Sequence, residues 1–363
     1  MAIDEVRLGG GVTEAAVLDA IKKSGYPLQA RAVEVALAAL SGSARSIRLF
    51  EEWSFIDSDT GTVRQLDALV QRIFEDIYDA ALSEGPLATD PRALLRYELD
   101  FLIECKQTEL PFIFFIRDHL YPPSLPTFVG LPRHGTFSVG EAGRDDRFFI
   151  DMRLQDFLPT MASPPTAISV SRCYRKGKAL ELSGEDVFRS LTAPTKKAFQ
   201  HYKSTSEKGL ENRLYHDIRM VHPIVVVDAP MLACHTKDGE ITLKEISAVR
   251  LPLTEPSTSA WHPTGTDGIS LDFVHIDHLD EYAKEALLTA RTLAETIDSI
   301  ALHVVTGRAI VDFENLPKSE DDFLSVLEPA IVGDDEVARW IKERSNEIHI
   351  RLAEENAEAA TDL

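Results

Sequence analysis

The feature that most limits the fold of this chain is an apolar run that ends in charged residues. In "LDFLIECKQ", which starts at Leu99, the run is followed by Glu104 and Lys106. Charged side chains are rarely buried within a strand unless they are paired or bind a metal. Because side chains alternate along a strand, Glu104 and Lys106 should face one side, and Ile103 and Cys105 the other.

A second isolated carboxylate, Asp67, lies in an earlier predicted strand, "RQLDALV". If the two strands are neighbours, Asp67, Glu104 and Lys106 converge on one point. Two carboxylates suit Mg²⁺, which keeps several waters and leaves room for a substrate phosphate, and a lysine can orient water or offset developing charge. Without a metal, like charges at one site should raise the pKa of one carboxylate. The alternative is a solvated strand face with a cross-strand ion pair.

Asp67 followed by Glu104-Cys105-Lys106 resembles the D…(D/E)-X-K signature of the restriction-endonuclease-like, or PD-(D/E)XK, nuclease superfamily. The helix "GYPLQARAVEVAL", the hairpin "EEWSFIDSDTGTVRQLDALV" and the strand "LDFLIECKQ" resemble its Mrr-like branch. The resemblance implies an αβββαβ core, dependence on Mg²⁺ or Mn²⁺, and endonucleolytic cleavage of nucleic acid, with DNA favoured, in restriction, defence or repair. It implies catalytic roles for Asp67, Glu104 and Lys106, with Asp67 and Glu104 as metal ligands.

The sequence departs from this pattern at two places. Glu104 follows Asp67 by 37 residues, which is long for adjacent strands, so we expect an insertion over 71–97. The first helix of such nucleases often carries a glutamate at the metal, and here the candidates for that place are Gln29 and Glu34.

The order of predicted elements indicates an α/β or α+β protein. We expect residues 1–107 to hold the first part of the nuclease-like core and 108–183 a β-rich insertion. Residues 184–300 should hold the second part of the core, including a helix around Pro194. Residues 301–363 should form a C-terminal helical extension with an acidic tail.

Composition limits the partners. The formal net charge of −21, from 38 basic and 59 acidic residues, opposes nucleic-acid binding through the whole surface. The net charge does not oppose binding in a local basic groove. The best candidate for such a groove is the basic cluster Arg172, Arg175, Lys176 and Lys178. The alternative is that this cluster is a solvated hairpin. The three cysteines are too few for a disulfide framework, and no signal peptide or membrane-spanning run is evident. We therefore expect a cytoplasmic protein that does not enter membranes.

Two further patterns, and one alternative use of the same fold, compete with the nuclease interpretation. "DSDTG", from Asp57, resembles the D-x-D-x-T loop of aspartate-based phosphotransferases, but a hairpin turn fits better because "EEWSF" is a poor preceding strand. His275 and His278 lack an evident third zinc ligand, so surface or capping roles are favoured. The alternative function is a non-catalytic restriction-like fold that serves as a protein-interaction or nucleic-acid-binding module.

Cys105 should be a packed, inert thiol.

Overall fold

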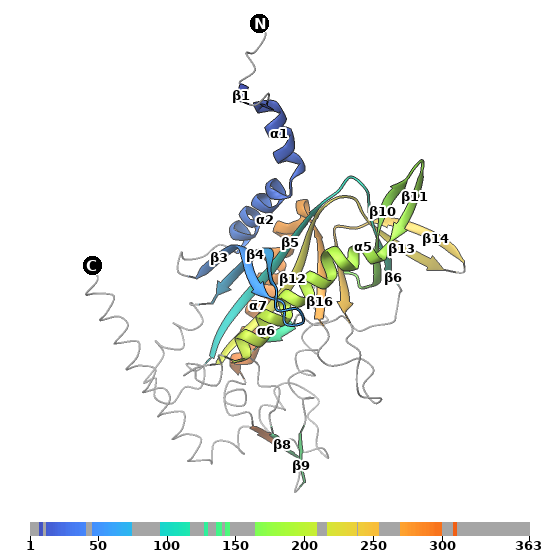
Figure 1. The fold of residues 1–363 in the computed structure, drawn as a ribbon. Helices are drawn as coiled ribbons and strands as arrows, with labels where there is room; N and C mark the ends of the chain where they lie inside the picture. Colours follow the sequence, from blue (N-terminus) through green and yellow to red (C-terminus); the bar gives the residue numbers. More distant parts are fainter. Residues whose placement is uncertain are drawn as a thin grey trace, which may run out of the picture.

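The structure is a computed structural model, and it describes residues 7–9, 12–40, 46–74, 95–116, 127–129, 136–139, 142–145, 164–208, 216–237, 239–253, 269–299 and 308–310. After two short strands, the described chain forms two helices, α1 (Glu14–Lys23) and α2 (Tyr26–Ala39). The hydroxyl of Thr13 caps α1 by accepting the N–H of Ala16, and Pro27 lies in the first turn of α2. No residue of α1 is buried, and the helix projects away from the body (Figure 1).

A seven-stranded sheet forms the centre of the protein. Its order is β15-β16-β12-β5-β4-β3, and the short β7 also pairs with β12. β4 is antiparallel to both of its neighbours, β3 and β5, whereas β5, β12 and β16 run parallel. The strands are β3 (Ile47–Ile56), β4 (Val63–Ile73), β5 (Leu95–Gln107), β7 (Thr127–Val129), β12 (His216–Asp228), β15 (Ala248–Leu253) and β16 (Ile269–His275).

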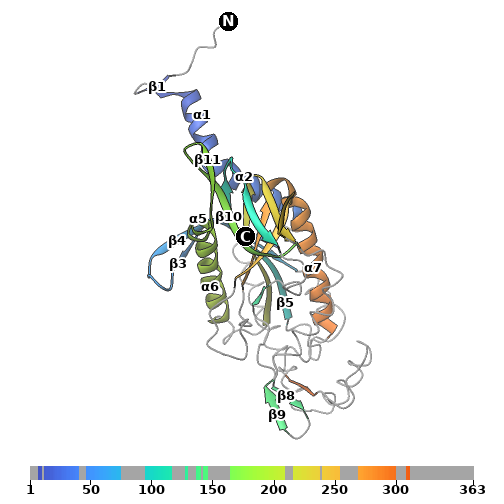
Figure 2. The same cartoon turned by 90° about the vertical axis from the view of Figure 1, so that its right-hand side faces the viewer.

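Helices cover both faces of this sheet. On one face α2 and α7 (Leu279–Ser299) pack on a core that includes Phe101 and Ile103 of β5. On the other face α6 (Ala193–Lys208) packs on a core that includes Leu102. Figure 2 shows α6 and α7 on opposite sides of the strands. The alternation predicted for β5 is confirmed, because Cys105 packs with Ile103 on the face of α2 and α7.

A second sheet of five strands has the order β11-β10-β6-β13-β14. Phe112 and Phe114 pack against Phe273, so one face of this sheet covers part of the central sheet. Its edge strands carry exposed apolar side chains, such as Leu180 and Ile241. The strands are β6 (Phe112–Ile116), β10 (Ala167–Lys176), β11 (Ala179–Ser183), β13 (Met231–Lys237) and β14 (Glu240–Glu245). The fold is therefore mixed α/β, which confirms the expected class but not the finer core arrangement.

The remaining described elements are short. α5 (Gly184–Val187), the π-helical turn η3 (Phe188–Thr192) and α6 follow one another without a gap, so the expected helix around Pro194 is confirmed. Pro194 lies two residues after the point where this run changes from π-helix to α-helix. The 3-10 turn η5 (Ile276–His278) precedes α7. Small pairings join β1 (Arg7–Gly9) to β2 (Val12–Thr13), and β8 (Thr136–Val139) to β9 (Ala142–Asp145) and β17 (Arg308–Ile310).

The expected insertion over 71–97 is too long at both ends, because residues 71–73 and 95–97 belong to strands. β4 continues to Ile73 and β5 already begins at Leu95, so much of the long interval is strand. Arg72 pairs with Leu99, although it opens the stretch "RIFEDIYDAAL", whose apolar residues have helical spacing. Pairing within the sheet overrides this local preference. Residues 75–94 lie outside the described residues.

Most of the expected C-terminal extension, 301–363, also lies outside the described residues, apart from β17. The second sheet takes strands both from the expected insertion, 108–183, and from 184–300. None of the described helices combines the length and the apolar character that crossing a membrane needs.

Candidate functional site

The predicted site lies where β4 and β5 separate. Their pairing runs from Ile73–Glu98 to Ala68–Ile103 and stops there, although both strands continue. Asp67 is the next residue of β4, and its carboxylate oxygen Oδ2 accepts the backbone N–H of Cys105 at 2.6 Å. At this point the hydrogen bond from the Cys105 N–H to the Asp67 side chain replaces the backbone–backbone pairing of the two strands. Burial raises the pKa of Asp67, although the bond from Cys105 opposes the change.

Glu104 and Lys106 lie beside Asp67 on the last residues of β5. The pKa of Glu104 is raised to about 8, first by burial and then by the carboxylate of Asp67, while the ammonium of Lys106 opposes the change. The expected pKa rise is therefore confirmed, with burial as its largest cause. All three side chains are half-buried. The structure brings Asp67, Glu104 and Lys106 together, and their chemical roles stay predictions.

Charged residues farther back on the same strand differ from these. Asp100 is fully buried, and its carboxylate accepts the hydroxyl of Tyr202 and, at 3.1 Å, the amide of Gln71. Glu98 pairs with Arg219 at 3.2 Å. By contrast, no hydrogen bond or ion pair to the Glu104 carboxylate is found within the described ranges. The carboxylates of Glu98 and Asp100 thus have partners inside the protein, although the Glu98–Arg219 contact is an ion pair without hydrogen-bond geometry. The carboxyl group of Glu104 is left for water or a ligand.

Gln29, and not Glu34, is the α2 residue at the site. The Gln29 side chain is 5% exposed, and its Nε2 donates to the backbone oxygen of Asp67 at 3.0 Å and to Oε1 of Glu52 at 3.2 Å. Glu34 is exposed. Sequence reasoning missed Glu52, a third carboxylate near Asp67 and Glu104 that contributes to the pKa rise of both. The only signal was that Glu51 and Glu52 interrupt the alternation of β3.

The donor chemistry at this point fits a hard divalent cation. Asp67 and Glu104 offer carboxylate oxygens, which Mg²⁺ and Mn²⁺ prefer. Within the described part of the chain, no group of three or more His, Cys, Asp or Glu side chains is arranged to hold a metal ion. A cation held by two carboxylates would therefore keep several of its waters, as Mg²⁺ commonly does.

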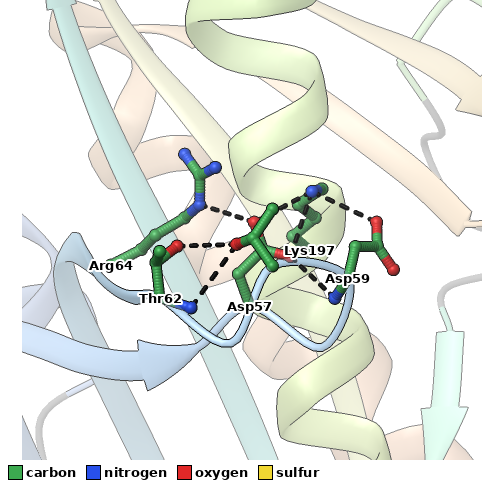
Figure 3. Close-up of polar contacts among 6 residues, drawn as sticks. Asp57, Asp59, Thr62, Arg64 and Lys197 are labelled. Atoms are coloured by element: carbon green, nitrogen blue, oxygen red, sulfur yellow. Dashed lines mark hydrogen bonds and ion pairs between the residues drawn. The ribbon is translucent and has the colours of Figure 1, made fainter.

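The "DSDTG" segment forms the turn between β3 and β4 and is fixed to α6. Asp57 is fully buried, and Figure 3 shows its carboxylate between Lys197 and Arg64. Lys197 Nζ lies 3.0 and 2.9 Å from its two oxygens, Arg64 Nε donates at 2.7 Å and the N–H of Asp59 at 3.1 Å. The bond from Lys197 holds the pKa of Asp57 well below its usual value. With both oxygens engaged, Asp57 is suited to anchor the turn and not to act as a nucleophile.

The two histidines bond to nearby residues of the following helical turns. His275 accepts the N–H of Asp277 through Nδ1 at 3.2 Å and so caps η5. Nδ1 of His278 lies 3.0 Å from the carboxylate of Glu281. These contacts agree with the capping and surface alternative.

The basic cluster lies on the hairpin formed by β10 and β11. Arg172 pairs with Asp186, and Lys176 lies 3.3 Å from Glu181. Arg175 and Lys178 are exposed. The positive charge of the cluster is thus partly offset by neighbouring carboxylates.

No family model, no curated protein and no solved structure matches this chain.

Proposed function

We propose that this protein is a metal-dependent endonuclease that hydrolyses phosphodiester bonds of nucleic acid, DNA in the first place. The observation that carries the proposal is the meeting of Asp67, Glu104 and Lys106 where β4 and β5 separate. Two carboxylates and an ammonium group, half-buried but open to solvent, are what metal-assisted hydrolysis of a phosphodiester needs.

Each of the three residues has a distinct role in this proposal. The carboxylates of Asp67 and Glu104 would hold Mg²⁺ or Mn²⁺, which when bound polarises a phosphoryl oxygen and lowers the pKa of a coordinated water. Glu104 would bind it as the carboxylate, so it must lose the proton that burial favours. Lys106 would orient the attacking water or offset the negative charge that develops on the phosphate.

The arrangement of elements supports the same proposal. If β6 to β11, α5 and η3 are taken as insertions between β5 and α6, then α2, β3, β4, β5, α6 and β12 follow the αβββαβ order of a restriction-endonuclease-like core, and β12 lies parallel beside β5. The second sheet and the elements after β12 would then be additions to this core.

The test is incubation of the purified protein with supercoiled plasmid, linear DNA and RNA, with Mn²⁺, with Mg²⁺ and with a chelator. We expect cleavage only with a divalent cation, and loss of cleavage with retained folding for Asp67→Ala, Glu104→Ala and Lys106→Ala. If wild type cuts none of these substrates, or if all three variants cut as well as wild type, the proposal fails.

The second candidate is the same fold used without catalysis, as a protein-interaction module. The observation in its favour is the net charge of −21, which repels a phosphate backbone. It predicts that Mn²⁺ neither supports cleavage nor stabilises the protein.

A further inference from the structure

The residues Gln29 and Glu52 make contacts at the candidate site that the proposed catalytic roles do not use. Glu52 has a φ of 50°, and it is the one non-glycine residue with positive φ in the part of the chain that the structure describes. Such a conformation is strained for an L-residue with a long side chain, and it persists only where the surroundings impose it. The neighbouring pairs Glu51–Ala68 and Trp53–Leu66 keep one register, so no inserted residue explains the strain.

The strained conformation coincides with a contact to α2. Oε1 of Glu52 accepts one N–H of the Gln29 amide at 3.2 Å, and the backbone oxygen of Asp67 accepts from the same nitrogen at 3.0 Å. An amide nitrogen has two hydrogens, so the two acceptors use both. Because both partners are acceptors, the contacts also fix which end of the Gln29 amide is the nitrogen.

The contacts of Gln29 and Glu52 bear on the position of the Asp67 main chain. β4 leaves β5 there, so the backbone ladder with β5 no longer determines where the Asp67 main chain lies. Gln29 holds that main chain from the face of α2, while the side chain of Asp67 binds the N–H of Cys105. We infer that Gln29 and Glu52 form a positioning pair, in which Glu52 orients the Gln29 amide and that amide fixes the backbone of Asp67 for cation binding. The inference rests on the proposed function for its consequence, although the positioning itself does not depend on activity.

The positioning can be measured in metal-free protein. Labelling with ¹⁵N-cysteine gives amide signals for Cys105, Cys173 and Cys234. The Cys105 N–H bonds to the Asp67 carboxylate, so its proton shift and its rate of hydrogen exchange report where Asp67 lies. Cys173 and Cys234 serve as internal references.

Two variants remove the pair in different ways. Gln29→Met keeps the size of the side chain and removes both donors, and Glu52→Gly removes the carboxylate and suits a φ of 50°. In both we expect the Cys105 signal to move and its exchange to accelerate. The Mn²⁺ concentration that gives half of the thermal shift should rise at least about tenfold, as it does when partners that orient metal ligands are lost. Glu52→Gly should nevertheless melt at or above the wild-type temperature, because it relieves strain.

Two further variants separate positioning from general stability. Glu52→Gln still offers an oxygen to the Gln29 amide, so it should restore the Cys105 signal and most of the Mn²⁺ response. Glu51→Gly, at the adjacent exposed position of the same strand, should lower the melting temperature and leave the Cys105 signal unchanged.

An unchanged Cys105 signal in Gln29→Met and Glu52→Gly would overturn the inference, as would a moved signal with an unchanged Mn²⁺ response. If wild type neither binds Mn²⁺ nor cleaves nucleic acid, the proposed function fails, and the Cys105 signal alone then decides whether the pair positions Asp67.

Discussion

Replacing Glu104 by glutamine should stabilise the metal-free protein, although it removes a proposed ligand. The pKa of Glu104 lies near 8 in the folded protein, against an ordinary value of 4.5. At a pH between these values the folded state keeps a proton that the unfolded state releases. Wild-type stability should therefore fall by about 1.4 kcal/mol for each pH unit across this window.

The size of the effect follows from the same two values. At about pH 7 the wild-type penalty would be about 3.4 kcal/mol at most. Because Glu104 is half-buried and water screens part of the field, we expect about half of that, about 1.7 kcal/mol. Glutamine carries no charge at any pH. The advantage of Glu104→Gln should therefore vanish below about pH 4.5, grow as the pH rises and level off above about pH 8.

Urea unfolding with a chelator present, at several values between about pH 4 and 9, measures this advantage. Glu51→Gln is the matched control, since Glu51 is exposed on β3 and its replacement should leave stability unchanged. The reasoning is refuted if Glu104→Gln is less stable than wild type at neutral pH, or if both proteins show the same pH dependence.

Three other predictions concern the site and its surroundings. Free Mn²⁺ at a hundred times its dissociation constant should stabilise wild type by about 2.7 kcal/mol, and Mn²⁺ should act at lower concentrations than Mg²⁺. The variant Asp67→Asn/Glu104→Gln should not be stabilised, and equal melting shifts in both proteins would contradict this prediction. Cys105→Ala should keep cleavage, because burial raises the pKa of the thiol well above its usual value and leaves it unreactive; a folded but inactive variant would show otherwise. Reversing the charges of Arg175 and Lys176 should weaken DNA binding in low salt, and unchanged binding would remove this hairpin from the interface.

The sequence predicted the catalytic candidates because they break a simple pattern. Glu104 and Lys106 are charged positions in an apolar strand, and strand alternation then gives their face without a structure. Glu52 could not be found in the same way. Its contact with Gln29 comes with a positive φ that regular strand geometry does not contain.

The extent of the sheets was harder to predict for a different reason. The ladder between β4 and β5 includes Arg72, in a stretch with helical spacing, so only the pairing reveals it as strand. The second sheet joins β6 to β13, which are more than a hundred residues apart in the chain. Contacts of that range depend on the packing of the whole domain, which local patterns do not encode.

The turn between β3 and β4 provides a test of how α6 holds the hairpin that carries Asp67. Lys197 of α6 is the main cause of the lowered pKa of Asp57, so Lys197→Met should raise that pKa and destabilise the protein. A lowered pKa stabilises the folded state above the unfolded value of 3.8, and this stabilisation is lost as the pH falls below it. The gap between wild type and Lys197→Met should therefore be complete at neutral pH and shrink in acid, and Asp57→Asn should recover part of the loss in the variant. Unfolding at neutral and acidic pH measures the gap. A gap that stays constant would mean that Lys197 stabilises the turn by packing and not through the charge of Asp57.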